Sequence, residues 1–139
     1  MNFDNPAVFG EIIPDVEYIK RPGSYGLILD ELGRVGMLSS CLPGGGAEPG
    51  ESEEQTLHRE VREECGWTIE IIERLGFAFE YVFAEGEGYF RKGCTFYRAK
   101  RIGSMSFDPP DLLWLEPGPA ARQLKFGSQR WAVSLLGPE

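Results

Sequence analysis

The chain has 139 residues, of which 42% are hydrophobic and 12% aromatic, so we expect one folded domain rather than a disordered chain. Its net charge of −8 and pI of about 4.7 make a long nucleic acid or an anionic membrane a poor electrostatic partner. No apolar segment approaches the length of a membrane-spanning helix, and the N-terminus lacks the pattern of a signal peptide.

The three cysteines, Cys41, Cys65 and Cys94, lie far apart and form neither a CxxC pair nor a zinc-binding spacing. This usage is typical of reduced thiols, because disulfides are rare in reducing compartments. We therefore expect a cytoplasmic protein.

The first part of the chain predicts strands. Residues 1–22 combine short apolar pieces with prolines, which is typical of a short strand or two at a sheet edge. Residues 24–30 form an apolar strand candidate, and residues 34–38 form a second. Gly33 lies between these two candidates, so the pair is predicted to form a hairpin.

A glycine-rich break precedes the clearest helix. Pro43 and three following glycines interrupt regular structure. Ser52 and Gln55 then match a capping box, in which each side chain accepts a backbone N–H of the other residue. Gly66 is a typical helix terminator. The sequence therefore predicts a helix that begins after Ser52 and ends before Gly66.

The second half predicts more strands and a C-terminal helix. Strand candidates cover 68–72, 75–84 and 89–100, and a glycine-containing loop makes the last two an antiparallel pair. After a proline-rich loop, 107–111, the segment 112–115 is predicted as a short buried strand. A helical region opens at Pro117, and Ser128 is predicted as the N-cap of a last helix, 129–136. Helices among many strands indicate a mixed α/β layer fold.

The central helix has an unusual distribution of charge. At about 100° per residue, Leu57 and Val61 share the face that packs on a sheet, and Glu60, Glu63 and Glu64 share the neighbouring face. Like charges at this spacing repel each other, by a few tenths of a kcal/mol when exposed. A divalent cation removes this cost, because Mg²⁺ prefers carboxylate, water and phosphate oxygens. A glycine turn beside the helix would let backbone carbonyls approach the same ion.

A glutamate-rich helix alone is most often a solvated surface, and a glycine run alone is most often a turn. Here the two stand at a fixed separation, matching G-x5-E-x7-R-E-U-x-E-E-x-G-U, where U is a bulky apolar residue. The matching residues are Gly45, Glu51, Arg59, Glu60, Val61, Glu63, Glu64, Gly66 and Trp67. In these residues the chain resembles the Nudix hydrolases, and we extend the resemblance over most of the sequence as a single Nudix hydrolase domain, 1–139.

The resemblance implies an α/β/α sandwich with a mixed β-sheet, and hydrolysis of a nucleoside diphosphate linked to another group. It implies that Glu60, Glu63 and Glu64 bind Mg²⁺, with Mn²⁺ as an alternative, and that the backbone of Gly45 completes the metal shell. It also implies that Arg59 orients the carboxylates by ion pairing. A metal ion neutralises a diphosphate and lowers the pKa of a bound water, so the chemistry agrees with these roles.

The general base is left open between several acids. Glu63 or Glu60 on the helix is one alternative. Some members of the family use an acid from a later loop, and here the loop candidates are Asp111 and Asp108. Both lie beside prolines, where an aspartate is often only a turn residue.

Substrate contacts are expected outside the motif. We predict Arg21, Tyr25, Phe79 and Tyr81 as substrate-binding residues, because an aromatic ring can stack on a nucleobase and a guanidinium can bind phosphate. Further candidates for a terminal phosphate are Arg91 and Lys92. Strand alternation places Glu80 on the face opposite Phe79 and Tyr81, towards the catalytic side.

We expect a small nucleoside diphosphate derivative as the partner, no long nucleic acid and no membrane, with a homodimer as an open alternative. Three functions remain under comparison. The first is a pyrophosphohydrolase of nucleoside triphosphates, and the second is a hydrolase of nucleotide sugars or dinucleoside polyphosphates. The third is a non-catalytic nucleotide-sensing module, which the intact set of motif acids disfavours.

Overall fold

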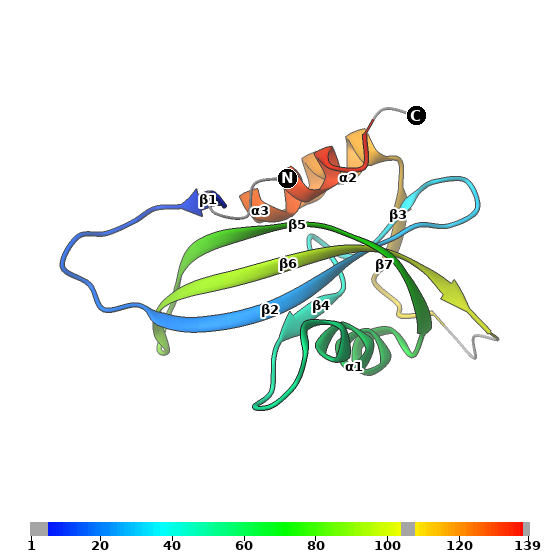
Figure 1. The fold of residues 1–139 in the computed structure, drawn as a ribbon. Coiled ribbons are helices and arrows are strands. Elements are labelled where there is room, and N and C mark those ends of the chain that lie inside the picture. Colours follow the sequence, from blue (N-terminus) through cyan, green and yellow to red (C-terminus); the bar gives the residue numbers. More distant parts are fainter. Residues whose placement is uncertain (1–5, 104–107, 138–139) are drawn as a thin grey trace.

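The computed structural model describes residues 6–103 and 108–137 (Figure 1). A five-stranded mixed sheet in the order β1-β5-β6-β2-β4 lies between α1 on one face and α2 with α3 on the other, and β3 pairs with β7 in a separate two-stranded sheet. The bounds are β1 Ala7–Gly10, β2 Ile19–Ile28, β3 Val35–Leu38, β4 Gly44–Gly46, α1 Glu53–Cys65, β5 Thr68–Ala84, β6 Gly88–Ile102, β7 Leu112–Leu115, α2 Pro117–Gln123 and α3 Gly127–Ser134. The predicted α/β/α sandwich with a mixed sheet is confirmed.

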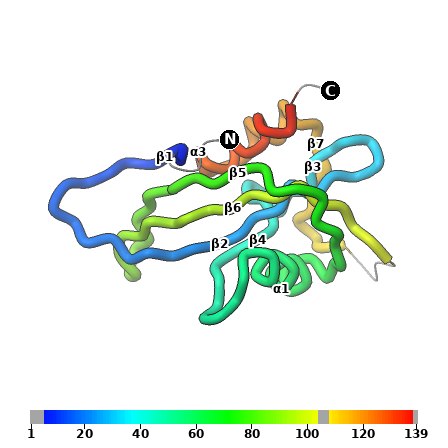
Figure 2. The backbone as a smooth tube through the Cα atoms, in the orientation of Figure 1, coloured from blue at the N-terminus to red at the C-terminus, as the bar shows by residue number. Residues whose placement is uncertain are grey.

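The sheet is built around the long antiparallel pair β5–β6, which was predicted (Figure 2). β1 joins β5 in parallel, β2 joins β6 in parallel, and β4 closes the other edge antiparallel to β2. The division of residues 68–84 into two strands was wrong. They form one strand with register shifts between Ile71 and Glu73 and between Arg74 and Gly76, because bulges bend a strand without ending it.

The predicted hairpin of residues 24–30 and 34–38 was wrong in its pairing. The turn exists: Asp30 N–H donates to the carbonyl of Arg34 at 3.0 Å, and Gly33 has a positive φ of 78°. Beyond the single bridge between Leu29 and Val35, however, β3 leaves β2 and pairs with β7. Two other strands, β6 and β4, occupy the edges of β2, so β3 finds its partner elsewhere.

Helix α1 follows the sequence prediction at both ends. Ser52 Oγ accepts the N–H of Gln55 at 3.1 Å, and Gln55 Oε1 accepts the N–H of Ser52 at 2.9 Å. Gly66 ends the helix in the left-handed conformation, with a φ of 72°. Leu57 and Val61 are fully buried, in a cluster that α1 forms with the sheet.

The opposite layer differs from the prediction at the start of α3. Phe126 is the N-cap and has no side-chain capping bond, so the expected N-cap role of Ser128 was wrong. Ser128 lies in the first turn, where its N–H donates to Glu80 Oε1 at 2.8 Å. A buried carboxylate from the sheet therefore does the work of a cap, which the local sequence does not reveal.

Two smaller expectations are also settled. The strand predicted at 112–115 is present as β7, but it is not buried, since Leu113 is 38% exposed. Cys41, Cys65 and Cys94 are all free, as predicted. Of the proline-rich loop, Phe107 lies outside the described residues.

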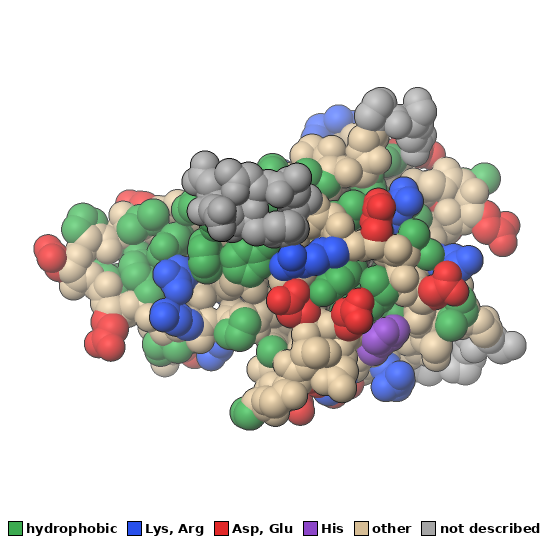
Figure 3. All heavy atoms as spheres, in the orientation of Figure 1, with side chains coloured by type: hydrophobic (Ala, Val, Ile, Leu, Met, Phe, Trp, Pro, Cys, Tyr) green, Lys and Arg blue, Asp and Glu red, His purple; other side chains and the backbone are tan. Residues whose placement is uncertain are grey.

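The end of the sheet that α1 does not cover exposes hydrophobic side chains (Figure 3). Exposed hydrophobic residues of the strands include Val8, Ile19 and Phe83. Among the residues described, none of the helices combines the length and apolar character needed to span a bilayer.

The capping box makes a direct prediction for stability. Ser52→Ala removes the acceptor for Gln55 N–H, so we expect the free energy of unfolding to fall by about 1 kcal/mol. Urea unfolding followed by circular dichroism measures this difference. Ser52→Asp, which keeps an acceptor at the N-cap, should remain close to the parent. Equal losses in both variants would contradict a capping role.

Candidate active site

Arg59 on α1 holds a cluster of acids together. Its Nε and Nη2 donate to the two oxygens of Glu51 at 2.7 and 3.0 Å. Its Nη1 donates to Glu60 Oε1 at 2.8 Å and to Glu63 Oε2 at 3.2 Å. Nη2 also donates to the carbonyl of Gly46 at 2.8 Å. One guanidinium therefore joins α1 to β4 and to the loop before the helix.

The pKa shifts in this cluster follow from these contacts. Hydrogen bonding to Arg59, and then to the N–H of Glu48, lowers the pKa of Glu51 to about 2. The hydrogen bonds with Glu51 and Glu60 hold the pKa of Arg59 above its usual value. Both partners are therefore firmly charged near neutral pH.

Glu64 follows Glu63 on α1, and among the described residues no arginine pairs with it. Its Oε1 accepts the N–H of Gly44 at 2.8 Å. Although part of the side chain is open to solvent, desolvation by surrounding protein raises its pKa to about 7. The Gly44 bond opposes this rise, and repulsion from Glu60, Glu63 and Asp111 adds to it. Burial is therefore the main cause of the raised pKa of Glu64, and the neighbouring acids reinforce it.

Gly45 lies in close contact with the Glu60 carboxylate. β4 pairs with β2, and a Cβ added at Gly45 would lie 2.6 Å from both Cδ and Oε2 of Glu60. A Cβ at Gly46 would meet nothing closer than 3.8 Å. A side chain at position 45 would therefore displace the Glu60 carboxylate, the flexible end of that side chain, from its present position.

The donor chemistry of this region fits a hard divalent cation. Within residues 6–103 and 108–137, no group of three or more acidic, histidine or cysteine side chains is already arranged around a common point. The three predicted ligands nevertheless lie on adjoining turns of α1, and Glu60 and Glu63 share the Nη1 of Arg59. Their oxygens are the ligand type that Mg²⁺ prefers.

A cavity of about 320 Å³ opens beside this cluster. Four predicted site residues, Arg21, Tyr25, Gly45 and Glu64, line it. Burial raises the pKa of Tyr25, so its hydroxyl stays protonated. Glu80 and Lys92 also line the cavity, which agrees with the predicted orientation of Glu80. The volume suits a small ligand.

Phe79 and Tyr81 are not among the residues that line this cavity. They alternate with Glu80 along β5 and therefore occupy its opposite face. The ring of Phe79 contacts Phe77, with centroids 5.1 Å apart, and lies under the guanidinium of Arg91 at 4.6 Å. The ring of Tyr81 packs edge-on against Tyr18 at 5.0 Å. Their aromatic character is used in packing within that face.

The two loop acids lie in different surroundings. Asp111 Oδ2 accepts the hydroxyl of Ser39 at 3.2 Å, and Asp111 is close enough to raise the pKa of Glu64. Asp108 accepts the indole N–H of Trp67 at 3.3 Å and pairs with Arg101 at 3.2 Å. The structure therefore brings Asp111 towards the acidic cluster and uses Asp108 elsewhere.

The sequence did not identify the contribution of α3 to the cavity. Phe126, Ser128 and Gln129 all line it. Gln129 Oε1 accepts the N–H of Leu42 at 2.9 Å across 87 residues of chain. No local pattern reports such a contact, because it depends on how α3 docks on the sheet.

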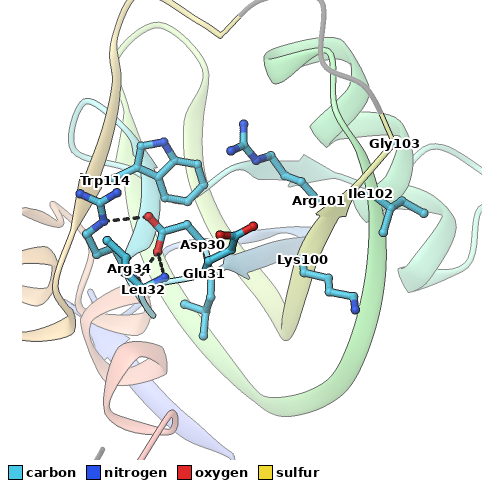
Figure 4. Close-up of a pocket in the computed structure, with 10 residues that line it drawn as sticks. Asp30, Glu31, Leu32, Arg34, Lys100, Arg101, Ile102, Gly103 and Trp114 are labelled. Carbon is cyan, nitrogen blue, oxygen red and sulfur yellow. Dashed lines mark hydrogen bonds and ion pairs between the residues drawn. The ribbon is translucent and has the colours of Figure 1, made fainter.

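A larger cavity, about 730 Å³, lies where the β2–β3 turn meets the end of β6 (Figure 4). It contains none of the predicted site residues. Arg34 pairs with Asp30 at 2.7 Å, and the guanidinium of Arg101 lies 4.8 Å from the ring centre of Trp114. These basic groups are therefore already engaged within the protein.

The comparisons with known proteins agree with this geometry. A model of the NUDIX domain matches residues 27–111. A MutT protein from Bacillus halodurans is 24% identical, with 82% of this chain and 80% of that chain covered and a TM-score of 0.66. A MutT protein from Methanosarcina mazei Go1 is 20% identical, with 86% of this chain and 94% of that chain covered and a TM-score of 0.67. The C. elegans Ap4A hydrolase is 21% identical, with 86% of this chain and 96% of that chain covered and a TM-score of 0.62. At these identities the likeness establishes the fold. No curated protein sequence matches the chain.

The contrast between the two glycines of β4 can be tested. Gly45→Ala places a methyl group against the Glu60 carboxylate and displaces it from Arg59, so we expect a loss of about 1–2 kcal/mol in the free energy of unfolding. Gly46→Ala is the matched control and should cost less than about 0.5 kcal/mol. Urea unfolding of both variants gives the comparison, and equal losses would contradict the proposed contact.

The Glu51–Arg59 pair predicts a dependence of stability on pH. Glu51 has a pKa of about 2 in the folded chain and an ordinary value of 4.5. Between these values the unfolded chain binds the extra proton, so stability is full above about 4.5 and falls as the pH falls towards 2. Glu51→Gln should therefore be less stable than the parent at pH 7, with a difference that shrinks on acidification.

Urea unfolding at pH 7, 4 and 3 measures this trend. Glu48→Gln is the control, because Glu48 is 64% exposed and its oxygen lies 3.6 Å from Arg59 Nε. A difference between parent and Glu51→Gln that stayed constant with pH would rule out the ion pair as its source.

Proposed function

Because this chain belongs to the Nudix family, we propose that it is an enzyme that hydrolyses a phosphoric anhydride bond in a nucleoside diphosphate derivative with the help of a divalent cation. One observation carries the proposal. Glu60, Glu63 and Glu64 lie on adjoining turns of α1 beside the glycine strand β4, and Glu64 lines a cavity of about 320 Å³.

Glu60, Glu63 and Glu64, with the carbonyl oxygen of Gly45, are the groups proposed to hold the cation, which we propose to be Mg²⁺ or Mn²⁺. When bound, the cation supplies neutralisation of the diphosphate and a lowered pKa for water. The glutamates carry the charge that attracts it, and Gly45 leaves space for the Glu60 carboxylate. The support for this assignment is the oxygen donor set and the position of the three glutamates on adjoining turns of α1.

Arg59 is proposed to position the acids. Its contacts with Glu60 and Glu63 restrain two carboxylates, and its paired contact with Glu51 anchors the guanidinium. Water attacks phosphorus in line with the leaving group, while a carboxylate accepts its proton. Glu63 is our first candidate for that base because its side chain is 59% exposed and makes a single contact with Arg59, through Nη1. Glu60 and Asp111 are the alternatives.

The cavity is proposed to bind the substrate. Arg21 and Lys92 are neighbours across β2 and β6 and provide two positive charges on its lining. In a chain of net charge −8, these cations offset repulsion between the protein and a phosphate group. Tyr25 adds an aromatic ring and a protonated hydroxyl. Phe79 and Tyr81 have no part in this arrangement.

Within this class, the leading proposal is a nucleoside triphosphate pyrophosphohydrolase. A nucleotide-sugar or dinucleoside polyphosphate hydrolase is the alternative. Proteins of similar structure include a dihydroneopterin triphosphate pyrophosphohydrolase from E. coli and the C. elegans Ap4A hydrolase. Product analysis separates them. A triphosphate gives a monophosphate and pyrophosphate, whereas a nucleotide sugar gives a monophosphate and a sugar phosphate.

A non-catalytic sensing module would need the ligand site without the chemistry. Every acid and the arginine of the motif are present here, and Arg59 engages three of the acids. This complete network favours catalysis.

Replacement of the proposed base tests catalysis directly. A panel of nucleoside triphosphates, nucleotide sugars and dinucleoside polyphosphates with Mg²⁺ should reveal hydrolysis of at least one compound by the parent. Glu63→Gln keeps the size of the side chain but removes the carboxylate, so we expect kcat to fall by orders of magnitude, roughly 100-fold or more. Addition of EDTA should abolish the activity of the parent.

Glu54→Gln is the matched control, because Glu54 lies in the exposed first turn of the same helix. It should keep the activity of the parent. A Glu63→Gln variant as active as the parent would remove Glu63 from catalysis, and activity that persisted in EDTA would contradict the metal-dependent mechanism.

A further inference from the structure

The far end of the 320 Å³ cavity contains two buried polar side chains whose hydrogen-bonding capacity is incompletely used. Glu80 on β5 and Gln129 on α3 are each only 4% exposed, and both line the cavity. Among the described residues, Ser24 Oγ is the one side-chain atom that is fully buried without a partner, so the free atoms of Glu80 and Gln129 remain accessible, and both residues line the cavity where a ligand can reach them.

The hydrogen bonds of these two residues define which atoms remain available. Glu80 Oε1 accepts the N–H of Ser128, and within the described part of the chain Glu80 Oε2 has no partner. Gln129 Oε1 accepts the N–H of Leu42. A backbone N–H can only donate, so this contact assigns the amide orientation and leaves Gln129 Nε2 as a donor with no partner among the described residues.

Lys92 does not neutralise Glu80 through a direct contact. The two are cross-strand neighbours, but the ammonium of Lys92 lies 5.1 Å from the ring centre of Phe126. No ion pair joins Lys92 to Glu80 in residues 6–103 and 108–137. The cavity therefore presents an acceptor from Glu80 and a donor from Gln129. The two residues are linked because Glu80 binds the N–H of Ser128, which precedes Gln129 in α3.

These groups stand at the opposite end of the cavity from the acidic cluster. β4 and Glu64 border one end, and β5 and α3 border the other, with β2 and β6 between them. Three strand spacings separate β4 from β5, which is about 14 Å. That span is longer than a diphosphate alone needs, and it suits a nucleotide whose phosphates lie near Glu64 and whose base lies near Glu80.

We propose that Glu80 and Gln129 recognise a nucleobase of the lactam type, in which a ring N–H stands beside a carbonyl. The ring N–H donates to Glu80 Oε2, and Gln129 Nε2 donates to the carbonyl oxygen. Guanine, hypoxanthine and uracil carry this pair. Adenine and cytosine present a ring nitrogen that accepts, so it would face the acceptor of Glu80. The inference rests on the proposed function and adds the class of base.

Guanine gains a further contact because its exocyclic amino group lies next to the ring N–H. A carboxylate accepts from both donors at once, since each oxygen has two lone pairs and Ser128 uses only one of them. Comparison of guanosine with inosine nucleotides therefore reports on the amino group alone.

The first experiment needs no variant. Isothermal titration of the parent with GMP, IMP, UMP, AMP and CMP should show tighter binding of the three lactam nucleotides, by tenfold or more for GMP over AMP. With Mg²⁺, kcat/KM for GTP should exceed that for ATP by a similar factor. Equal affinity for GMP and AMP, or no binding of either, would overturn the inference.

Glu80→Gln is the decisive variant. One amide oxygen can still accept Ser128 N–H and preserve α3, while the new NH₂ would face a ring N–H. We expect the GTP-to-ATP ratio of kcat/KM to fall tenfold or more, with hydrolysis of ATP retained. Gln129→Glu keeps the acceptor for Leu42 N–H, removes the donor and should lower the same ratio. Glu85→Gln, an exposed acid in the adjoining turn, should leave it unchanged.

The outcomes separate the two proposals. Equal hydrolysis of GTP and ATP by the parent would leave the hydrolase intact and overturn the base recognition. Selective binding of GMP without hydrolysis of any nucleotide would support the base recognition and remove the proposed activity. A purely structural role for Glu80 would change thermal stability and both substrates alike, with no change in their ratio, and that result would also overturn the inference.

Discussion

The ion-pair network of Arg59 is the interaction on which the candidate site depends. Arg59 holds Glu51 through two hydrogen bonds, reaches Glu60 and Glu63 through its Nη1, and donates to the carbonyl of Gly46. Without this cation, several carboxylates would repel each other on one helix and its preceding loop. The network also connects three pieces of chain that pack around the start of the cavity. Local electrostatics and tertiary structure are therefore coupled at one side chain.

The sheet places two groups of polar residues at opposite ends of the cavity. β4 and α1 bring the acidic cluster to one edge, while β5 and α3 bring Glu80 and Gln129 to the other. Between them, Arg21 on β2 and Lys92 on β6 lie in register across the sheet. Alternation along each strand decides which side chains face this cavity. For this reason Glu80 lines the cavity, whereas its neighbours Phe79 and Tyr81 pack on the opposite face.

The features that the sequence predicted correctly depend on residues close together in the chain, whereas the features it missed depend on contacts between distant segments. The capping box at Ser52, the stop at Gly66 and the buried face of Leu57 and Val61 depend on residues within a few positions, and all are present. The pairing of β3 with β7 joins segments about 75 residues apart, and competition for the edges of β2 decides it. Ser128 matched an N-cap locally, but a carboxylate from β5 took its place.

By itself, the sequence identified the family through a fixed motif spacing, and the resemblance implied the α/β/α layers. Helical periodicity, a local property of the chain, placed the acids together on α1. The sequence also placed Glu80 opposite Phe79 and Tyr81 through strand alternation. Only the tertiary structure decided which strand β3 joins and where α3 presents Gln129. Those features arise from contacts between distant segments, whose energies depend on packing that no short stretch of sequence contains.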